Sequence, residues 1–295
     1  MKIFFLDQYI DSSYIIKNIA FKNIGSAKTK NNDDLLCYAM NLEYLKIADE
    51  NKNISGIITL PSLQDKSRKV VATSDEPDIL YGMISNQLID QGYIKPTMEF
   101  KKSDCAIIDP SAYVSEKTYI GGNVHIGKNV IINDYTIVED DCIIGDNVVL
   151  GCEGFYFKRN HKGELVKFLH AGGVHLCKNV EIMTGSIVQR AHDADFTKIG
   201  EGTKVSVHCN ISHSANIGKH NMITGNVQIA GRVKMGDYCW IGNSSTLSDS
   251  VVIGDNVTIR IGSVVISDIK EKEEVSGNFA YNHRKRVRNF LKEQR

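Results

Sequence analysis

The chain has 295 residues, and its 35 lysines and arginines balance its 35 aspartates and glutamates, so the formal net charge is zero. This balance argues against a basic surface that attracts nucleic acid and against a strongly acidic protein. The seven cysteines show no C-x-x-C spacing, which favours reduced thiols in the cytoplasm over a disulfide framework or a zinc site.

The first apolar run, Met1–Leu6, turns polar at Asp7 and is too short for a signal peptide. No later run approaches the roughly 20 apolar residues that cross a bilayer. We therefore expect a cytoplasmic protein without a membrane span.

Residues 1–103 mix two kinds of pattern. The runs Ile54–Leu60 and Val70–Ala72 are typical of strands, whereas Asp78–Ile84 is typical of a helix. We predict a small α/β domain here.

From Ile108 onward an aliphatic residue recurs at every sixth position, and the residue two places before it is small. The aliphatic series is Ile108, Val114, Ile120, Ile126, Ile132, Val138, Ile144 and Leu150, then Leu176, Ile182 and Val188, and, after a slip of one residue, Ile199, Val205, Ile211, Ile217, Ile223, Ile229, Met235, Ile241, Leu247, Ile253, Ile259 and Val265. Period six fits neither an α-helix nor a simple strand alternation. It predicts a mainly β protein, a parallel β-helix over residues 104–268 whose triangular coils stack and bury one continuous core.

Two segments leave this pattern. Residues 152–173 form an inserted loop rich in aromatic and charged residues, and long loops expelled from a regular scaffold are often functional. Residues 269–295 predict a helical cap, with a basic helix over Phe279–Arg295. Its basic cluster at 283–288 would contact CoA phosphates or an acidic carrier protein, or, as is more common, only solvent.

Three short segments carry residues beyond those that the repeat requires: Tyr38-Ala-Met-Asn41-Leu-Glu-Tyr44, Gly154-Phe155-Tyr156 and Asn210-Ile-Ser-His213. Together they resemble the bacterial UDP-3-O-acylglucosamine N-acyltransferase family, and the similarity covers most of the chain. The resemblance implies a left-handed winding of the β-helix and a homotrimer. It also implies transfer of an acyl group from a thioester to the amine of a nucleotide sugar.

The resemblance gives residues 1–103 the role of uridine binding. The rings of Tyr38 and Tyr44 would hold the base and Asn41 would read its edge, because a base stacks well on an aromatic ring. Packing within a helix would explain the same spacing of three. Phe155 and Tyr156 would lie near the sugar and acyl groups, although a hydrophobic clasp onto a neighbouring subunit would also account for them.

His213 is the candidate general base, because acyl transfer to an amine needs a group that takes a proton near neutral pH. It follows the inward Ile211 by two residues, which predicts a position at a corner or on the outer face of the prism, where a substrate can reach it. One coil of eighteen residues further along stands Gly231, about 5 Å away by strand stacking. The resemblance makes Gly231 the oxyanion donor and places Gly231 and Arg232 against the acyl donor.

The chain also departs from the family. Ser206 and Val207 replace an Asp-Asn pair, and the segment Ser248–Ser250 replaces a second family histidine. We therefore expect an N-acyltransferase on a UDP- or dTDP-amino sugar for a surface glycan or lipopolysaccharide, with acyl-CoA or the phosphopantetheine of an acyl carrier protein as co-substrate. No metal and no covalently bound cofactor are expected. Alternatives are the lipid A pathway enzyme, a sugar O-acetyltransferase and a non-enzymatic trimeric scaffold.

The segment His192-Asp193-Ala-Asp195 has residues that could bind a metal, and it falls at the slip in the repeat. We interpret it as a solvated bulge, with a loop that contacts substrate as the second choice.

Overall fold

The computed structural model describes residues 2–29, 33–277, 284, 285 and 292. The chain divides into two compact units. The N-terminal unit comprises Met1–Glu99, Gly151–Val174 and Arg190–Phe196, and the prism unit comprises Phe100–Leu150, His175–Gln189 and Thr197–Arg295.

The N-terminal unit is built on a four-stranded parallel sheet with strand order β3-β4-β5-β6. The strands are β3 (Asn23–Ile24), β4 (Leu35–Ala39), β5 (Ile54–Thr59) and β6 (Val70–Thr73), and the helices are α1 (Leu42–Glu50) and α2 (Pro77–Asp90). Two short antiparallel pairs complete it: β1 (Phe4–Phe5) with β2 (Ala20–Phe21), and β16 (Phe157–Arg159) with β17 (Leu165–Lys167). The α/β prediction for this region is therefore confirmed.

Apolar side chains form two separate clusters in this unit. One cluster joins Leu36 and Ile58 of the sheet to Ile84 and Leu88 of α2. The other joins Leu35, Ile57 and neighbouring residues to the buried side of α1. Pro77 occupies the first turn of α2, where a missing backbone N–H costs nothing.

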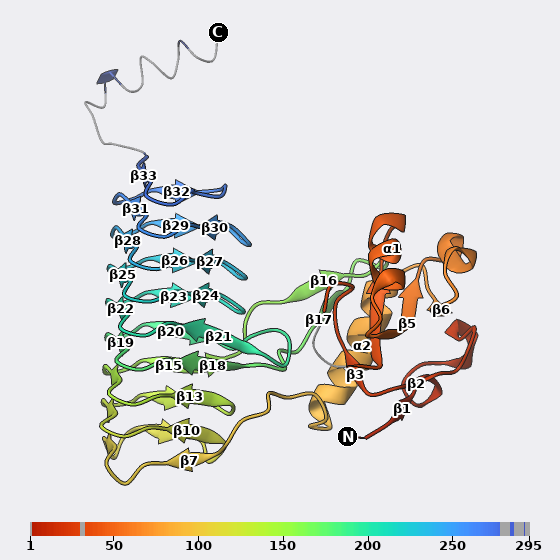
Figure 1. Ribbon diagram of the computed structural model, residues 1–295, viewed down its shortest axis with the longest axis horizontal. Helices are drawn as coiled ribbons and strands as arrows, with labels where there is room; N and C mark the ends of the chain where they lie inside the picture. Colours follow the sequence, from red (N-terminus) through yellow and green to blue (C-terminus); the bar gives the residue numbers. More distant parts are fainter. Residues whose placement is uncertain (1, 30–32, 278–283, 286–291, 293–295) are drawn as a thin grey trace. The chain divides into compact units, whose positions relative to one another are not determined.

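The prism unit consists of three parallel sheets whose strands alternate along the chain (Figure 1). Sheet one contains β7 (Lys101–Lys102), β10 (Thr118–Ile120), β13 (Thr136–Val138), β18 (Gly173–Leu176), β21 (Phe196–Ile199), β24 (Asn216–Ile217), β27 (Lys234–Met235) and β30 (Val252–Ile253). Sheet two contains β8 (Ile107–Ile108), β11 (His125–Ile126), β14 (Ile143–Ile144), β19 (Glu181–Ile182), β22 (Lys204–Val205), β25 (Met222–Ile223), β28 (Trp240–Ile241), β31 (Thr258–Ile259) and β33 (Glu274–Val275). Sheet three contains β9 (Tyr113–Val114), β12 (Ile131–Ile132), β15 (Val149–Cys152), β20 (Ile187–Gln189), β23 (Asn210–Ile211), β26 (Gln228–Ile229), β29 (Thr246–Leu247) and β32 (Val264–Val265).

The hexad pattern sets this architecture. Successive coils pair in register eighteen residues apart, as Ile211 does with Ile229. Each inward aliphatic residue from Ile120 to Val265 is buried, and the first two, Ile108 and Val114, are half-buried at the start of the prism. The predicted parallel β-helix is therefore confirmed.

The corners of the prism have a left-handed backbone conformation at every sixth residue. In the first coils these residues are Asn123, Asn129, Tyr135, Asp141 and Asn147, with φ between 54° and 63°. Asn and Asp tolerate this region better than most residues, because their short side chains can bond the nearby backbone.

Two insertions leave the prism, and both lie between a sheet-three strand and the next sheet-one strand. Ile144 pairs with Ile182 across a difference of 38 residues, which places twenty extra residues between β15 and β18. Ile182 in turn pairs with Val205, 23 residues on, rather than the usual eighteen. The predicted one-residue slip is therefore wrong, because the chain makes a five-residue insertion between β20 and β21 and then resumes its register.

The predicted C-terminal helix, Phe279–Arg295, falls almost wholly outside the described residues. In the part of the chain that the structure describes, no helix has the length and apolar character needed to cross a bilayer.

Candidate active site

His213 lies in the turn that follows β23, at the edge of the prism where the chain passes from sheet three to sheet one. Its backbone is fixed, since its carbonyl accepts a hydrogen bond from the N–H of Arg232 at 2.9 Å. The N–H of the next residue, Ser214, donates to Thr197 Oγ1 at 2.8 Å. His213 is half-buried, which confirms its predicted position at a corner.

Gly231 packs directly against the imidazole of His213. A Cβ atom on Gly231 would lie 2.5 Å from His213 Nε2 and 2.9 Å from Asp249 Oδ1. Real Cβ contacts are almost never so short, so any larger residue would displace these two side chains. The predicted eighteen-residue stacking of His213 and Gly231 is thus present in the structure.

Asp249 was not predicted as a functional residue, although its position follows from the same step. Eighteen residues lead from His213 to Gly231, and eighteen more lead to Asp249. Asp249 forms an ion pair with Arg232, with 2.7 Å between Oδ2 and the guanidinium nitrogen. Arg232 Nε also donates to Ser250 Oγ at 3.1 Å. This edge therefore combines an imidazole, a carboxylate and a guanidinium, and the last two remain about half-exposed.

The five residues predicted to bind the nucleotide sugar belong to the N-terminal unit. Asn41 caps α1, because its side chain accepts from the N–H of Tyr44 at 2.9 Å. Tyr44 lies in the first turn of α1 and is 44% exposed. Tyr38 belongs to strand β4, so the alternative of three residues packing along one helix is wrong.

The ammonium of Lys158 lies near the rings of both Tyr38 and Tyr156. The ammonium of Lys158 is 5.1 Å from the ring centre of Tyr38 and 6.0 Å from that of Tyr156. The same ammonium pairs with Asp78 of α2 at 2.7 Å. Phe155, by contrast, is 83% exposed and contacts the ring of Phe157.

The N-terminal unit contains a cavity of about 270 Å³ that sequence reasoning missed. Its walls include Gly25, Tyr81, His192, Asp193 and Asp195. The segment interpreted as a solvated bulge therefore lines a cavity.

None of the five predicted nucleotide-binding residues lines this cavity, but two of them support its walls. The ring of Tyr38 packs 5.0 Å from that of Tyr81, and Tyr156 meets the ring of His192 edge-on at 4.7 Å. Burial, with a further contribution from the charge of Asp193, raises the pKa of Tyr81. The Tyr81 hydroxyl therefore keeps its proton and donates it to the carbonyl of Gly25 at 3.2 Å.

Comparison with known families supports the repeat. Residues 117–152 and 232–267 match the bacterial transferase hexapeptide family, described by six repeats. No curated protein matches the chain.

Three solved structures are similar to parts of the chain. The UDP-N-acetylglucosamine acyltransferase from Campylobacter jejuni has 22% identity and a TM-score of 0.50, over 60% of this chain and 72% of that one. LpxA from Acinetobacter baumannii has 26% identity and a TM-score of 0.39, over 63% and 76%. The acetyltransferase domain of PglB from Neisseria gonorrhoeae FA1090 has 13% identity and a TM-score of 0.28, over 88% and 98%. The first of these supports the β-helix fold of the chain and gives no information about its substrate.

Proposed function

We propose that this protein is an N-acyltransferase that moves an acyl group from a thioester to the amine of a UDP- or dTDP-linked amino sugar. One observation carries the proposal: the His213 imidazole and the Asp249 carboxylate both border Gly231 on a prism of transferase-type hexapeptide repeats. A half-buried imidazole with a carboxylate nearby suits proton transfer during attack on a carbonyl.

In the proposed reaction the sugar amine attacks the thioester carbon. The C–N bond forms, the C–S bond breaks, and the thiol leaves with a proton. His213 takes the proton that the amine loses, and Asp249 holds the imidazole in orientation. The backbone N–H of Gly231 stabilises the oxyanion, an interaction that contributes about 3–4 kcal/mol in other acyl-transfer enzymes.

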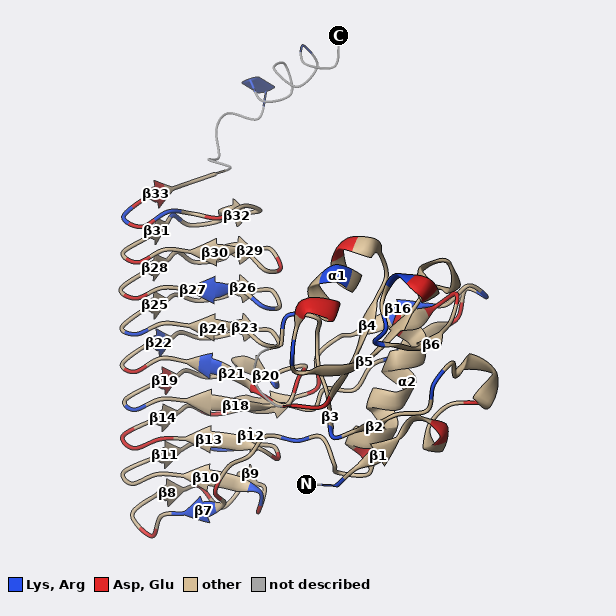
Figure 2. Cartoon of the chain, turned by 45° about the vertical axis from the view of Figure 1, so that its right-hand side comes forward, with Lys and Arg blue, Asp and Glu red and all other residues tan. Residues whose placement is uncertain are grey.

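The acyl donor is assigned to the same edge of the prism. Arg232 offers a guanidinium that is about half-exposed, and Lys198 on β21 and Lys234 on β27 are exposed cations of sheet one, where Figure 2 shows basic segments. Positive charges on one face favour the phosphates of CoA or of a phosphopantetheine arm.

The nucleotide sugar is assigned to the N-terminal unit. Typical ligand pockets measure roughly 300–1,000 Å³, so a cavity of about 270 Å³ holds one part of such a ligand rather than all of it. The carboxylates of Asp193 and Asp195 can accept hydrogen bonds from a ribose hydroxyl or a base N–H. Tyr38 and Tyr44 keep their proposed role in stacking on the base.

A homotrimer is part of the proposal. Outward positions on sheet three are apolar in four successive coils: Tyr113, Ile131, Val149 and Ile187. Three of these side chains are among the exposed large hydrophobic residues, and a contiguous apolar face of this kind is typical of a subunit interface.

The test measures acylation of UDP- and dTDP-amino sugars by acyl-CoA and by acyl carrier protein, with product mass as the readout. His213→Ala should lower turnover about 10²–10⁴-fold. His220→Ala is the matched control, because His220 also lies at a corner against a glycine, Gly202, and should leave turnover unchanged. Turnover of His213→Ala near that of the wild type would overturn the assignment.

Hydroxy analogues of the same sugars separate N-acylation from O-acylation. A product from the hydroxy sugar alone would replace the proposal with a sugar O-acyltransferase. Transfer only of long chains from carrier protein would point to the lipid A pathway.

A further inference from the structure

Sheet one has a regular feature at the residue that follows each inward aliphatic side chain. In five coils this residue is glycine: Gly121, Gly200, Gly218, Gly236 and Gly254. A Cβ at any of them would lie within 3 Å of backbone atoms in the next coil. Close stacking of the coils therefore excludes side chains at this corner.

Two neighbouring coils break this rule. The equivalent residues are Glu139, after β13, and Cys177, after β18. The hydrogen bonds of the ladder continue through both, since Glu139 N–H donates to the carbonyl of Leu176 at 3.0 Å and Cys177 N–H donates to that of Ile199 at 2.9 Å. Side chains thus occupy this crowded corner in adjacent coils, and both are of types that bind metals.

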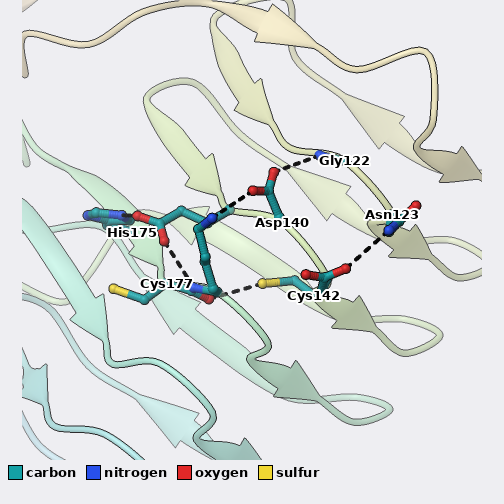
Figure 3. A network of polar contacts seen from close by, with 9 residues as sticks. Gly122, Asn123, Asp140, Cys142, His175 and Cys177 are labelled. Atoms are coloured by element: carbon teal, nitrogen blue, oxygen red, sulfur yellow. Dashed lines mark hydrogen bonds and ion pairs between the residues drawn. The ribbon is translucent and has the colours of Figure 1, made fainter.

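His175 adds a third residue to this pair. Its Nε2 is 2.7 Å from Glu139 Oε1, and one potential ligand atom from each of Glu139, His175 and Cys177 lies within 4.8 Å of the other two. All three residues are half-buried, and Figure 3 shows His175 and Cys177 close together beside the sheet.

The surroundings hold this group in place. Lys178 N–H donates to Glu139 Oε2 at 3.0 Å, while the Lys178 ammonium turns to Asp140 at 3.0 Å. Asp140 in turn accepts from the N–H of Gly122 at 2.9 Å, and Cys142 Sγ donates to the carbonyl of Cys177 at 3.1 Å (Figure 3). The Lys178 ammonium is therefore engaged by a neighbouring carboxylate, and the backbone on both sides is fixed.

We propose that Glu139, His175 and Cys177 bind a divalent transition-metal ion of the zinc type. Thiolate sulfur, imidazole nitrogen and carboxylate oxygen are the three ligand types that zinc takes in proteins, and a fourth position would hold water. On binding, the metal replaces the contact between His175 and Glu139, and the Cys177 thiol releases its proton to solvent.

The placement of the three ligands suggests a structural role. Glu139 precedes the twenty-residue insertion, and His175 and Cys177 follow it. A shared metal would close the base of this loop and link the coils on its two sides, which removes closure entropy from the unfolded chain. The site lies at a different edge of the prism from His213.

Cobalt(II) titration of the EDTA-treated full chain tests the proposal, because a thiolate ligand gives cobalt an intense near-ultraviolet charge-transfer band. The wild type and the control Cys105→Ser should bind one equivalent and show this band, since Cys105 is an exposed cysteine outside the cluster. Cys177→Ser should lose the band. Absence of the band in the wild type, or its survival in Cys177→Ser, would overturn the proposal.

A second measurement uses the wild type alone and so does not depend on the folding of any variant. Zn²⁺ should protect Cys177 from alkylation while Cys105 continues to react, as read by peptide mass spectrometry. It should also raise the melting temperature, because a ligand that binds only the folded state stabilises it. Equal alkylation of Cys177 with and without Zn²⁺ would contradict the site, whatever the outcome of the acylation assay.

Discussion

The prism unit and the N-terminal unit differ in how distance along the sequence relates to contact in space. In the prism, a step of eighteen residues leads from one side chain to the neighbour stacked on it, as from Ile211 to Ile229. In the N-terminal unit, Lys158 meets Asp78 across 80 residues that follow no period. The repeat therefore makes contacts in the prism readable from the sequence, whereas the contacts of the N-terminal unit depend on how its elements pack.

The strongest test of the eighteen-residue step is Gly231→Ala. The added Cβ would collide with the His213 imidazole and Asp249, so turnover should fall about 10²–10³-fold. Gly225→Ala is the matched control at another corner, because its nearest contact would be an ordinary 3.4 Å from Asn243. Steady-state turnover, with circular dichroism to confirm folding, provides the measurement. Equal activities of the two variants would show that close stacking at Gly231 has no part in the reaction.

A smaller effect is expected on sheet three, where the eighteen-residue step aligns apolar side chains on the outer face of the prism. Ile131→Lys places a charge in the middle of the apolar series on sheet three, and burying an unpaired charge is costly. The dissociation constant of the trimer should rise by at least about tenfold, measured by light scattering across protein concentrations. Met222→Lys makes the same change at an exposed outward position on sheet two and should leave the molar mass unchanged. A wild-type monomer would refute the trimer directly.

The smallest expected effect concerns the N-terminal unit. Burial opposes the charge of Lys158, but the hydrogen bond that Lys158 donates to Asp78 and the neighbouring Tyr38 and Tyr156 outweigh it and raise the pKa of Lys158. Lys158→Met leaves Asp78 without this partner and should lower the free energy of unfolding by about 1–3 kcal/mol, measured by urea denaturation.

The pH dependence of this ion pair has a definite sign. Because the folded-state pKa of Lys158 lies above its ordinary value of 10.5, the stabilisation is complete below that value and disappears as the pH rises through the folded-state pKa. The difference in stability between the wild type and Lys158→Met should therefore shrink only in strongly alkaline solution. A difference that stays constant throughout this alkaline range would assign the effect to packing rather than charge.

The prism could be predicted from the sequence because one period sets both its core and its corners. The inward series from Ile120 to Val265 and the stacking of Gly231 on His213 follow from counting. A further step of eighteen residues leads from Gly231 to Asp249, a residue that the family motifs do not indicate. The error at Val188–Ile199 concerns the length of the interruption. In a repeat of six residues, inserting five residues and deleting one residue shift the pattern to the same position, so the sequence alone does not distinguish them.

The remaining features depend on contacts that no short pattern records. The cavity of the N-terminal unit joins Gly25, Tyr81 and Asp193, which are separated by more than fifty residues at each step. The spacing of the cysteines does not reveal the proposed metal ligands, because Glu139 and Cys177 belong to different coils with the long insertion between them. Proximity in both places follows from the fold alone.

The two insertions have lengths of twenty and five residues, and neither is a multiple of six. After each one the next inward aliphatic side chain, Leu176 or Ile199, still enters the core and the ladder resumes. The corner between sheets three and one thus accommodates insertions of both lengths without a change in the register of the coils that follow. For protein engineering, this corner is therefore the place on the β-helix where an inserted loop can be exchanged while the register of the following coils is kept.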